Sequence, residues 1–244
     1  MRNLSNSLVA ITLAAAMSIT SIATADITID FESFANGQSV EGETIGLATI
    51  TSSGANLGAA IYDSDPPTGA DPDLEFSLGT LGNILILQST DSPSMTGDIF
   101  NTPNDEADGG FLYFDFASAV RMLSLDLVDI DDNGPARVTL YDSSGDRRRW
   151  YAPSQWTGDS DWETLDLTTL ADQAGPGSGG DATVTINDAG FDPDDVVRMV
   201  VKFYGSAGLD NVTYDDLEVI PAPGAALLAM MGFGTVGWVR RRIV

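Results

Sequence analysis

The stretch Asp26-Ile27-Thr28-Ile29-Asp30-Phe31 alternates polar and apolar residues with a period of two. Successive side chains of an extended chain point to opposite faces, so the three apolar residues share one face. Ten further short runs lie between clusters of Gly, Pro, Asn, Asp and Ser: 48–51, 59–62, 84–87, 111–116, 122–130, 137–141, 162–167, 182–186, 196–204 and 212–219. No amphipathic helix longer than three turns is evident. The pattern predicts an all-β fold, a two-sheet antiparallel β-sandwich of the jelly-roll kind.

Residues 1–25 have the organisation of a secretory signal peptide. Arg2 lies in a short first segment without acids, residues 8–22 are apolar, and Ala23-Thr24-Ala25 has the small-x-small form that signal peptidase cuts. We therefore expect the mature chain to begin at Asp26 and residues 26–219 to form one domain.

A second apolar segment closes the chain. Pro221-Ala222-Pro223 is followed by an apolar run over residues 224–239 and then by Arg240, Arg241 and Arg242. About 20 residues are needed to cross ~30 Å of hydrocarbon, and the run just reaches this length when Ile220 and the prolines are counted. The arginines would hold this end on the cytoplasmic side and leave the preceding domain outside. The alternative is a buried C-terminal helix, which gives the arginines no purpose.

The motif Pro221-Ala222-Pro223-Gly224, with the apolar run and the arginine cluster, resembles the PEP-CTERM sorting signal of exported bacterial proteins. Ala222 stands where most members of that family carry Glu. The resemblance covers only the tail, residues 220–244, and concerns destination. It implies that an exosortase, a membrane-embedded cysteine transpeptidase, removes the tail. The expected location is the cell surface or extracellular matrix, after a transient stage anchored in the inner membrane by the tail.

The middle of the chain is strongly acidic. Residues 26–219 hold all 36 acidic residues but only seven of the 11 basic ones, a formal charge of −29. This charge opposes nucleic acid and anionic membrane surfaces as partners, so we expect membrane contact only through the tail. Repulsion between carboxylates also opposes compaction unless cations offset it, and Ca²⁺ suits oxygen ligands. Simple solubility or adaptation to salty surroundings explains the charge equally.

The chain has neither Cys nor His. The lack of Cys excludes disulfides, thiolate catalysis and Cys-ligated zinc. The lack of His excludes Ser-His-Asp triads and most transition-metal sites. Carboxylates, Tyr, Arg and one Lys within the acidic domain remain for chemistry.

The loop over residues 63–74 is the first candidate metal site. It carries Asp63, Asp65, Asp71 and Asp73, with prolines that fix the backbone and a glycine that permits a tight turn. These carboxylates can converge on Ca²⁺. A solvated acidic loop is the alternative.

The stretch Asp129-Ile130-Asp131-Asp132-Asn133-Gly134 matches the first half of an EF-hand loop. Leu140 occupies the twelfth position, where a bidentate Glu is needed, and the flanking residues have the pattern of strands rather than helices. We therefore predict no EF-hand but a strand–turn–strand hairpin, either as a plain turn or with its acids near a cation.

Two short stretches carry a further resemblance. Gly208-Leu209-Asp210-Asn211-Val212 and Asp30-Phe31-Glu32 together resemble exported bacterial jelly-roll domains of the galactose-binding-like type. The loop Pro67-Thr68-Gly69 with residues 71–74 is similar to one in sorting-tail proteins of this layout. The resemblance implies a structural Ca²⁺ where the first and last strands lie side by side. By the same resemblance, Glu32 and Asp210 are its ligands.

Aromatic residues gather in the segment 147–156, beside the one run of arginines in the domain. Trp and Tyr stack on sugar rings, and Arg holds sugar hydroxyls or the carboxylates of acidic glycans. The predicted glycan-binding residues are Arg149, Trp150, Tyr151 and Trp156. In the alternative, Trp150 and Trp162 alternate into the core and the arginines pair with Asp142, Asp146, Asp159 or Asp161.

Catalysis has little support in the sequence. A glycosidase needs two carboxylates held ~5 to 9.5 Å apart. Many pairs, such as Asp161 with Glu163 or Asp192 with Asp194, meet the chemical requirement, and spacing does not single one out. We predict an exported binding or matrix protein that attaches to extracellular glycan and is not an enzyme. The alternatives are a purely structural surface or biofilm protein without a specific ligand, and a glycan-cleaving enzyme.

Overall fold

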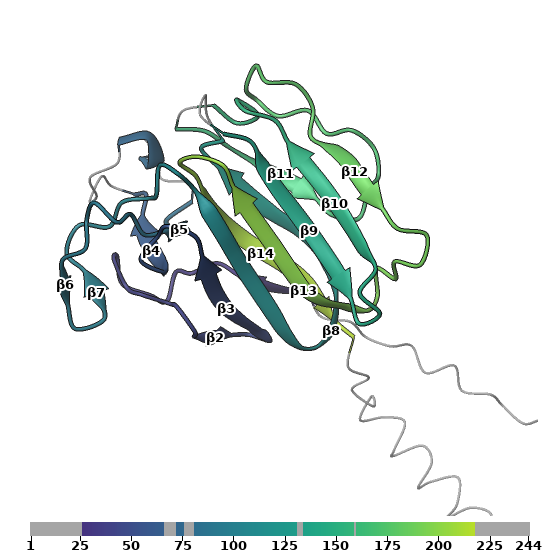
Figure 1. The fold of residues 1–244 in the computed structure, drawn as a ribbon, viewed down its shortest axis with the longest axis horizontal. Coiled ribbons are helices and arrows are strands. Elements are labelled where there is room, and N and C mark those ends of the chain that lie inside the picture. Colours follow the sequence, from purple (N-terminus) through teal and green to yellow (C-terminus); the bar gives the residue numbers. More distant parts are fainter. Residues whose placement is uncertain (1–25, 66–71, 76–80, 131–133, 159, 218–244) are drawn as a thin grey trace, which may run out of the picture. The chain divides into compact units, whose positions relative to one another are not determined.

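The computed structural model describes residues 26–65, 72–75, 81–130, 134–158 and 160–217, except for the side chain of Asp73. This part of the chain is all-β with antiparallel pairing (Figure 1). The strands are β1 (Asp26–Ile29), β2 (Thr44–Ile45), β3 (Ala48–Ser53), β4 (Ala59–Asp63), β5 (Asn83–Leu87), β6 (Met95–Thr96), β7 (Ile99–Phe100), β8 (Gly110–Val128), β9 (Ala136–Asp142), β10 (Arg147–Ala152), β11 (Trp162–Asp166), β12 (Thr183–Asn187), β13 (Val196–Phe203) and β14 (Gly208–Asp216). One 3-10 turn, η1 (Pro72–Leu74), lies between β4 and β5.

Strand β8 is 19 residues long and joins two groups of strands. Residues 110–116 of β8 lie between β13 and β3. Residues 124–128 lie between β14 and β11. The main path of the sheet is β12-β10-β9-β13-β8-β14-β5-β4, with β1 beside β14 and β2 beside β3. The long strand thus carries the chain from one group of paired strands to the other.

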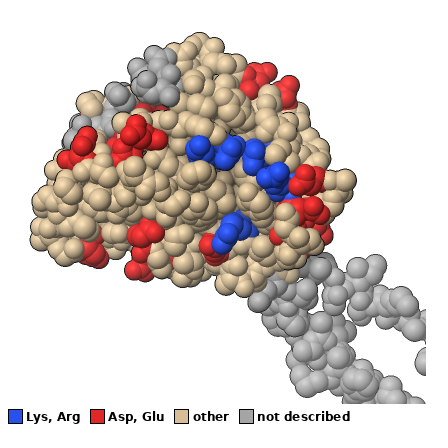
Figure 2. Space-filling view, in the orientation of Figure 1, with Lys and Arg blue, Asp and Glu red and all other residues tan. Residues whose placement is uncertain are grey.

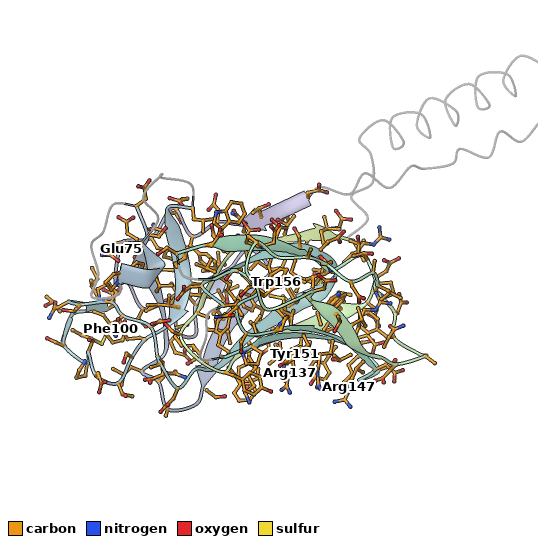
Figure 3. All side chains as sticks on the ribbon, turned by 90° about the horizontal axis from the view of Figure 1, so that it is seen from above. Glu75, Phe100, Arg137, Arg147, Tyr151 and Trp156 are labelled. Carbon is orange, nitrogen blue, oxygen red and sulfur yellow. The ribbon has the colours of Figure 1, made fainter. Side chains whose placement is uncertain are left out.

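Both groups of strands contribute to one hydrophobic core. On β8, Leu112 and Phe114 of the first part and Leu125 and Leu127 of the second are all buried in the same cluster. Figure 3 shows the strands in two layers, with Trp156 lying between them. A second, smaller cluster packs around Tyr62 on the other side of β4 and β5. The arrangement is compatible with a β-sandwich.

The expected strands are confirmed, with four differences in detail. Runs 111–116 and 122–130 belong to the single strand β8, and β10 had not been predicted as a strand. The short strands β2, β6 and β7 were not predicted either. The hairpin expected around Asp129 is wrong, because β13 lies between β8 and β9 in the sheet.

Several expectations concern residues outside those that the structure describes. These are the signal peptide 1–25, Asp71, the side chain of Asp73, the central residues 131–133 of the EF-hand-like stretch, and the tail with Pro221, Pro223, Arg240, Arg241 and Arg242. Residues Thr24–Glu218 form one compact unit. Among the described residues, no helix has the length and apolar character to cross a membrane.

Candidate functional site

The outward side of four neighbouring strands carries basic and aromatic side chains. The alternation that buries Leu112, Val138 and Val201 turns their neighbours along each strand outward. We call this surface the basic face, and Figure 2 shows Lys and Arg gathered on it. Its residues are Phe111, Tyr113 and Asp115 on β8, Arg198, Val200 and Lys202 on β13 with Tyr204 just beyond it, Arg137, Thr139 and Tyr141 on β9, and Arg147, Arg149 and Tyr151 on β10.

Strand register places these side chains in rows across the sheet. In one row, Phe111 is opposite Lys202, Lys202 is opposite Arg137, and Arg137 is opposite Tyr151. The adjacent row places Thr139 opposite Arg149. Neighbouring strands lie ~4.8 Å apart, so each row brings basic and aromatic groups within reach of one ligand.

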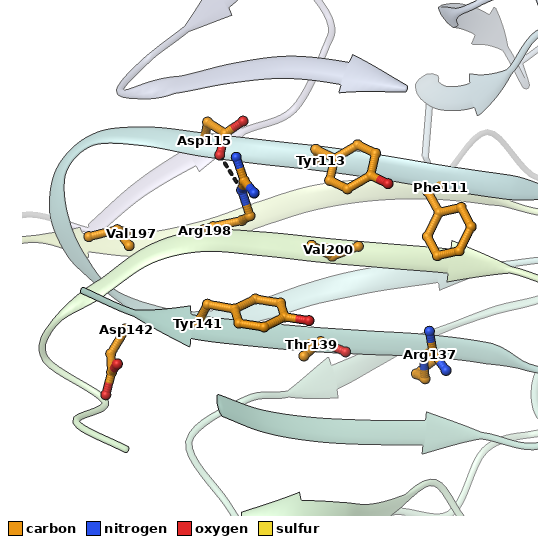
Figure 4. A pocket seen from close by; sticks show the side chains of 10 residues that line it. All are labelled: Phe111, Tyr113, Asp115, Arg137, Thr139, Tyr141, Asp142, Val197, Arg198 and Val200. Carbon is orange, nitrogen blue, oxygen red and sulfur yellow. Dashed lines mark hydrogen bonds and ion pairs between the residues drawn. The ribbon is translucent and has the colours of Figure 1, made fainter. Parts of the chain in front are cut away.

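An open hollow of about 530 Å³ lies on the basic face (Figure 4). Two carboxylates line it, and both already have partners. Asp115 forms an ion pair with Arg198. Asp142 is 3% exposed and accepts hydrogen bonds from the backbone N–H groups of Ser144 at 3.0 Å and Asp146 at 2.9 Å. The hollow therefore offers aromatic faces and cationic donors rather than free carboxylates.

Three cations of the basic face, Arg137, Arg149 and Lys202, have no carboxylate partner among the described residues. Lys202 Nζ lies 3.6 Å from the ring centre of Tyr204, and Arg137 donates to the Tyr204 hydroxyl at 3.2 Å. Arg149 Nε donates to Thr139 Oγ1 at 3.1 Å. Burial lowers the pKa of Arg149, and the charges of Arg137 and Arg147 lower it further.

The structure divides the predicted glycan-binding residues between surface and core. Arg149 and Tyr151 lie on the basic face, and Tyr151 is 37% exposed. Trp150 and Trp156 are 0% exposed, so neither indole is accessible to a sugar ring. Figure 3 shows Arg137, Arg147 and Tyr151 projecting from the same side of the molecule, away from Trp156. The prediction that Trp150 and Trp156 bind glycan is therefore wrong. The core alternative is confirmed for Trp150, and Trp156, which that alternative did not name, is buried as well.

The expected arginine partners differ from those in the structure. Arg147 Nε lies 3.7 Å from Asp188, and Arg148 donates to Asn187 at 2.8 Å. Of the acids named as alternatives, Asp142, Asp146 and Asp161 form no ion pair with these arginines, and Asp159 lies outside the described residues. Trp162 is partly buried against the second core cluster.

Sequence reasoning missed the contributions of β8, β9 and β13 to this surface. The signal was present in alternate positions of the predicted strands. Polar, charged or aromatic residues recur in Phe111-x-Tyr113-x-Asp115 and in Arg137-x-Thr139-x-Tyr141, and the charged Arg198 and Lys202 stand on either side of Val200 in the third triplet. Each triplet marks the outward side of its strand.

A second candidate site is a pair of buried carboxylates on β14 and β8, with the exposed Glu32 in the turn after β1 near them. As the galactose-binding-like resemblance implies, β1 pairs with β14. Asp210 on β14 is directly opposite Asp126 on β8, and both side chains are buried. Asp210 is 1% exposed, and its Oδ1 has no hydrogen-bond partner among the described residues. Burial raises the pKa of Asp210 to about 8, and the charges of Asp126, Glu32 and Asp30 add to this effect.

Hydrogen bonds hold the groups around Asp210. Glu32 Oε1 accepts from the N–H of Asn83 at 2.9 Å. Gly82 has a φ of 68°, and a Cβ at this position would overlap the Glu32 carboxylate. Asp126 accepts from Thr164 Oγ1 at 2.6 Å and from Asn211 Nδ2 at 2.8 Å. These contacts fix the turn after β1 beside β5. The Glu32 carboxylate in this turn is thereby held where its charge raises the pKa of Asp210.

The donor chemistry of this group fits a hard cation. Asp210 Oδ1 is an unpartnered buried oxygen, and oxygen ligands are those that Ca²⁺ prefers. However, no group of three or more acidic side chains within the described residues converges as in a formed metal site. Asp63 accepts from the N–H of Asp65 at 2.9 Å, and Asp65 is exposed. The charge of Glu32 thus raises the pKa of Asp210, whereas the exposed Asp65 is not among the charges that do so.

Comparison with known proteins adds no assignment to these two sites. No protein-family model matches the chain, and no curated protein matches it.

Proposed function

We propose that this chain is an exported, calcium-stabilised binding protein whose basic face attaches to extracellular glycan. The observation that carries the proposal is the basic face itself, a row of aromatic and basic side chains on an otherwise acidic domain. The proposed architecture is a two-sheet jelly roll, which accounts for the pairing of β1 with β14 and for the main core cluster shared by both groups of strands.

The chemistry of the basic face suits sugars. The rings of Tyr113 and Tyr151 offer apolar faces for stacking, and guanidinium groups donate to hydroxyls and carboxylates. The hollow lies over three paired strands, so its side chains are held on a rigid surface. The ion pair of Asp115 and the hydrogen bonds of Asp142 support binding rather than cleavage.

Calcium is proposed as a structural ion rather than a participant in glycan binding. Asp210 and Glu32, with Asp126 beside them, would hold it between the first and last strands. A bound cation supplies the missing partner of Asp210 Oδ1 and offsets the repulsion between the facing carboxylates. Because it binds only the native state, it would add to the stability of the domain.

Export is proposed from the two ends of the chain. Signal peptidase would remove residues 1–25, and an exosortase would remove the tail at the Pro221-Ala222-Pro223 motif. The purely structural surface protein and the glycan-cleaving enzyme remain the alternatives that the following experiment separates.

The experiment is retention of the mature domain, residues 26–219, on a panel of insoluble acidic and neutral polysaccharides. The proposal predicts retention on at least one glycan without release of reducing ends or unsaturated products. Arg149→Gln combined with Tyr151→Ala should lower retention by roughly tenfold or more, about 1.4 kcal/mol of binding free energy.

Arg121→Gln is the control variant, because Arg121 pairs with Asp194 and is not on the basic face. It should be retained like the wild type. Soluble sugar products would indicate an enzyme, and no retention on any glycan would favour a purely structural protein.

A further inference from the structure

The three cations Arg137, Arg149 and Lys202 stand out in a domain with 36 acidic residues. Three of the other four basic residues of the domain form an ion pair: Arg121 with Asp194, Arg147 with Asp188 and Arg198 with Asp115. The fourth, Arg148, donates to the amide of Asn187 and lies on the other side of β10. None of Arg137, Arg149 and Lys202 is within ion-pair distance of a carboxylate among the described residues. A region of this sheet therefore concentrates positive charge that the fold leaves uncompensated.

Strand register forces these charges together. Lys202 is directly opposite Arg137, and like charges in opposite positions of neighbouring strands are destabilising. Arg149 lies diagonally across from Arg137 on the next strand, because Arg137 is opposite Tyr151 and Thr139 is opposite Arg149. An anion between the three side chains would convert this repulsion into attraction.

Aromatic groups hold the cations in place. Lys202 Nζ lies 3.6 Å from the Tyr204 ring centre and 5.2 Å from that of Phe111. Arg137 donates to the Tyr204 hydroxyl, and its Nε is buried without a hydrogen-bond partner among the described residues. These contacts orient the donors before any ligand arrives, so less ordering accompanies binding.

We propose that Arg137, Arg149 and Lys202 form an anion-binding subsite that selects carboxylated polysaccharides over neutral ones. This inference rests on the proposed glycan-binding function and names its ligand class. Arg guanidinium groups match carboxylates in a bidentate geometry, and the tyrosines beside them receive the sugar rings. A polymer with one carboxylate per sugar suits a few clustered cations. Nucleic acid, with one charge per ~1.7 Å, is opposed by the acidic remainder of the domain.

The test measures binding of matched glycan pairs by affinity electrophoresis with the mature domain. Each pair consists of a carboxylated polysaccharide, such as polygalacturonate, alginate or hyaluronan, and the same polymer with its carboxyl groups reduced to alcohols. The wild type should bind at least one acidic polymer roughly tenfold or more tightly than its reduced counterpart. The combined variant Arg149→Gln with Lys202→Gln should lose this preference and bind both members of the pair equally.

The charge-matched control is Arg121→Gln with Arg148→Gln, which removes two cations that are not on the basic face. This variant should keep the preference, and melting curves identify any variant that fails to fold. Equal binding of acidic and reduced polymers by the wild type would overturn the inference but leave glycan binding intact. Failure to bind any member of any pair would contradict both proposals. Tighter binding to DNA or to a sulfated polymer than to every carboxylated one would also overturn the inference.

Discussion

The environment of Asp210 differs strongly from that of a solvated carboxylate. This residue is 1% exposed, has Asp126 directly opposite, and keeps one oxygen without a hydrogen-bond donor among the described residues. A buried carboxylate in this setting favours either a proton or a cation. Protonation and cation binding can be separated by changing the pH, because acid favours only protonation.

The metal-free domain should show a specific pH dependence from Asp210. Its folded pKa, about 8, lies above the unfolded value of ~3.9, so protonation favours the native state. The stabilising contribution is complete below pH ~4 and is lost as the pH rises through about 8. In chelator, Asp210→Asn should therefore melt at a higher temperature than the wild type at pH 8.5, with a smaller difference at pH 5. Equal melting temperatures at both pH values would contradict the proposed environment of Asp210.

Trp150 and Tyr151 are adjacent residues with opposite environments, which makes them a matched pair. Trp150→Ala should lower the free energy of unfolding by roughly 3–5 kcal/mol, because it removes a fully buried indole. Tyr151→Ala should change stability much less and should weaken glycan retention. Urea denaturation and the retention assay measure the two effects. A loss of retention in correctly folded Trp150→Ala, without any loss in Tyr151→Ala, would reverse the assignment of faces.

At the scale of elements, the loop over residues 175–179 packs against the backbone of the segment 154–156. The N–H of Gly177 donates to Trp156 O at 2.9 Å, and the N–H of Gly179 donates to Gln155 O at 3.0 Å. A Cβ on Gly177 would overlap the backbone of Gln155. The glycine-rich loop is therefore required for close backbone contact over the buried Trp156, in addition to any flexibility it has.

Gly177→Ala should detach this loop from Trp156. We expect a lower melting temperature, by several degrees, and a red-shifted tryptophan emission as water reaches the indole. Ala in place of Gly180 is the control, because no heavy atom lies within 4 Å of a Cβ there. Its φ of 98° makes some strain unavoidable, so the emission spectrum is the deciding measurement. Unchanged emission in Gly177→Ala would argue against the role of this loop in shielding Trp156 from water.

The alternation of residue types predicted the strands because each has a buried and an outward side. It did not predict their order, because pairing joins residues far apart in the chain, as when β13 lies between β8 and β9. The continuity of β8 was also hidden, since Ala117, Ser118 and Ala119 interrupt its apolar alternation. A shift of one residue exchanges the two sides of a strand, which is why Trp150 and Tyr151 could not be told apart in β10. Glu32 and Asp210 were identified from a resemblance, whereas Asp126 entered only through strand register.

At the scale of the whole domain, the distribution of charge matters more than its total. Residues 26–219 have a formal charge of −29, yet five of their seven basic residues lie on the basic face. Such a domain is repelled by polyanions at long range and attracts a carboxylated chain only at one surface. Salt should weaken the attraction at that surface by screening it.

Calcium removal tests the structural ion at this scale. The melting temperature at pH 7.5 should fall markedly in chelator, because a ligand that binds only the native state no longer contributes. Ion identification by mass spectrometry should find calcium in the untreated domain. Asp210→Asn should melt at the same temperature with and without calcium. An unchanged wild-type melting curve would contradict every calcium ligand proposed above.

The central claim is that the basic face binds glycan. It is tested most directly by mapping backbone amide shifts in NMR spectra of the mature domain during titration with an acidic oligosaccharide. The account predicts that the largest shifts fall on β9, β10 and β13 around Arg137, Arg149 and Lys202. Shifts confined to other strands, with those three amides unmoved at saturating oligosaccharide, would contradict it.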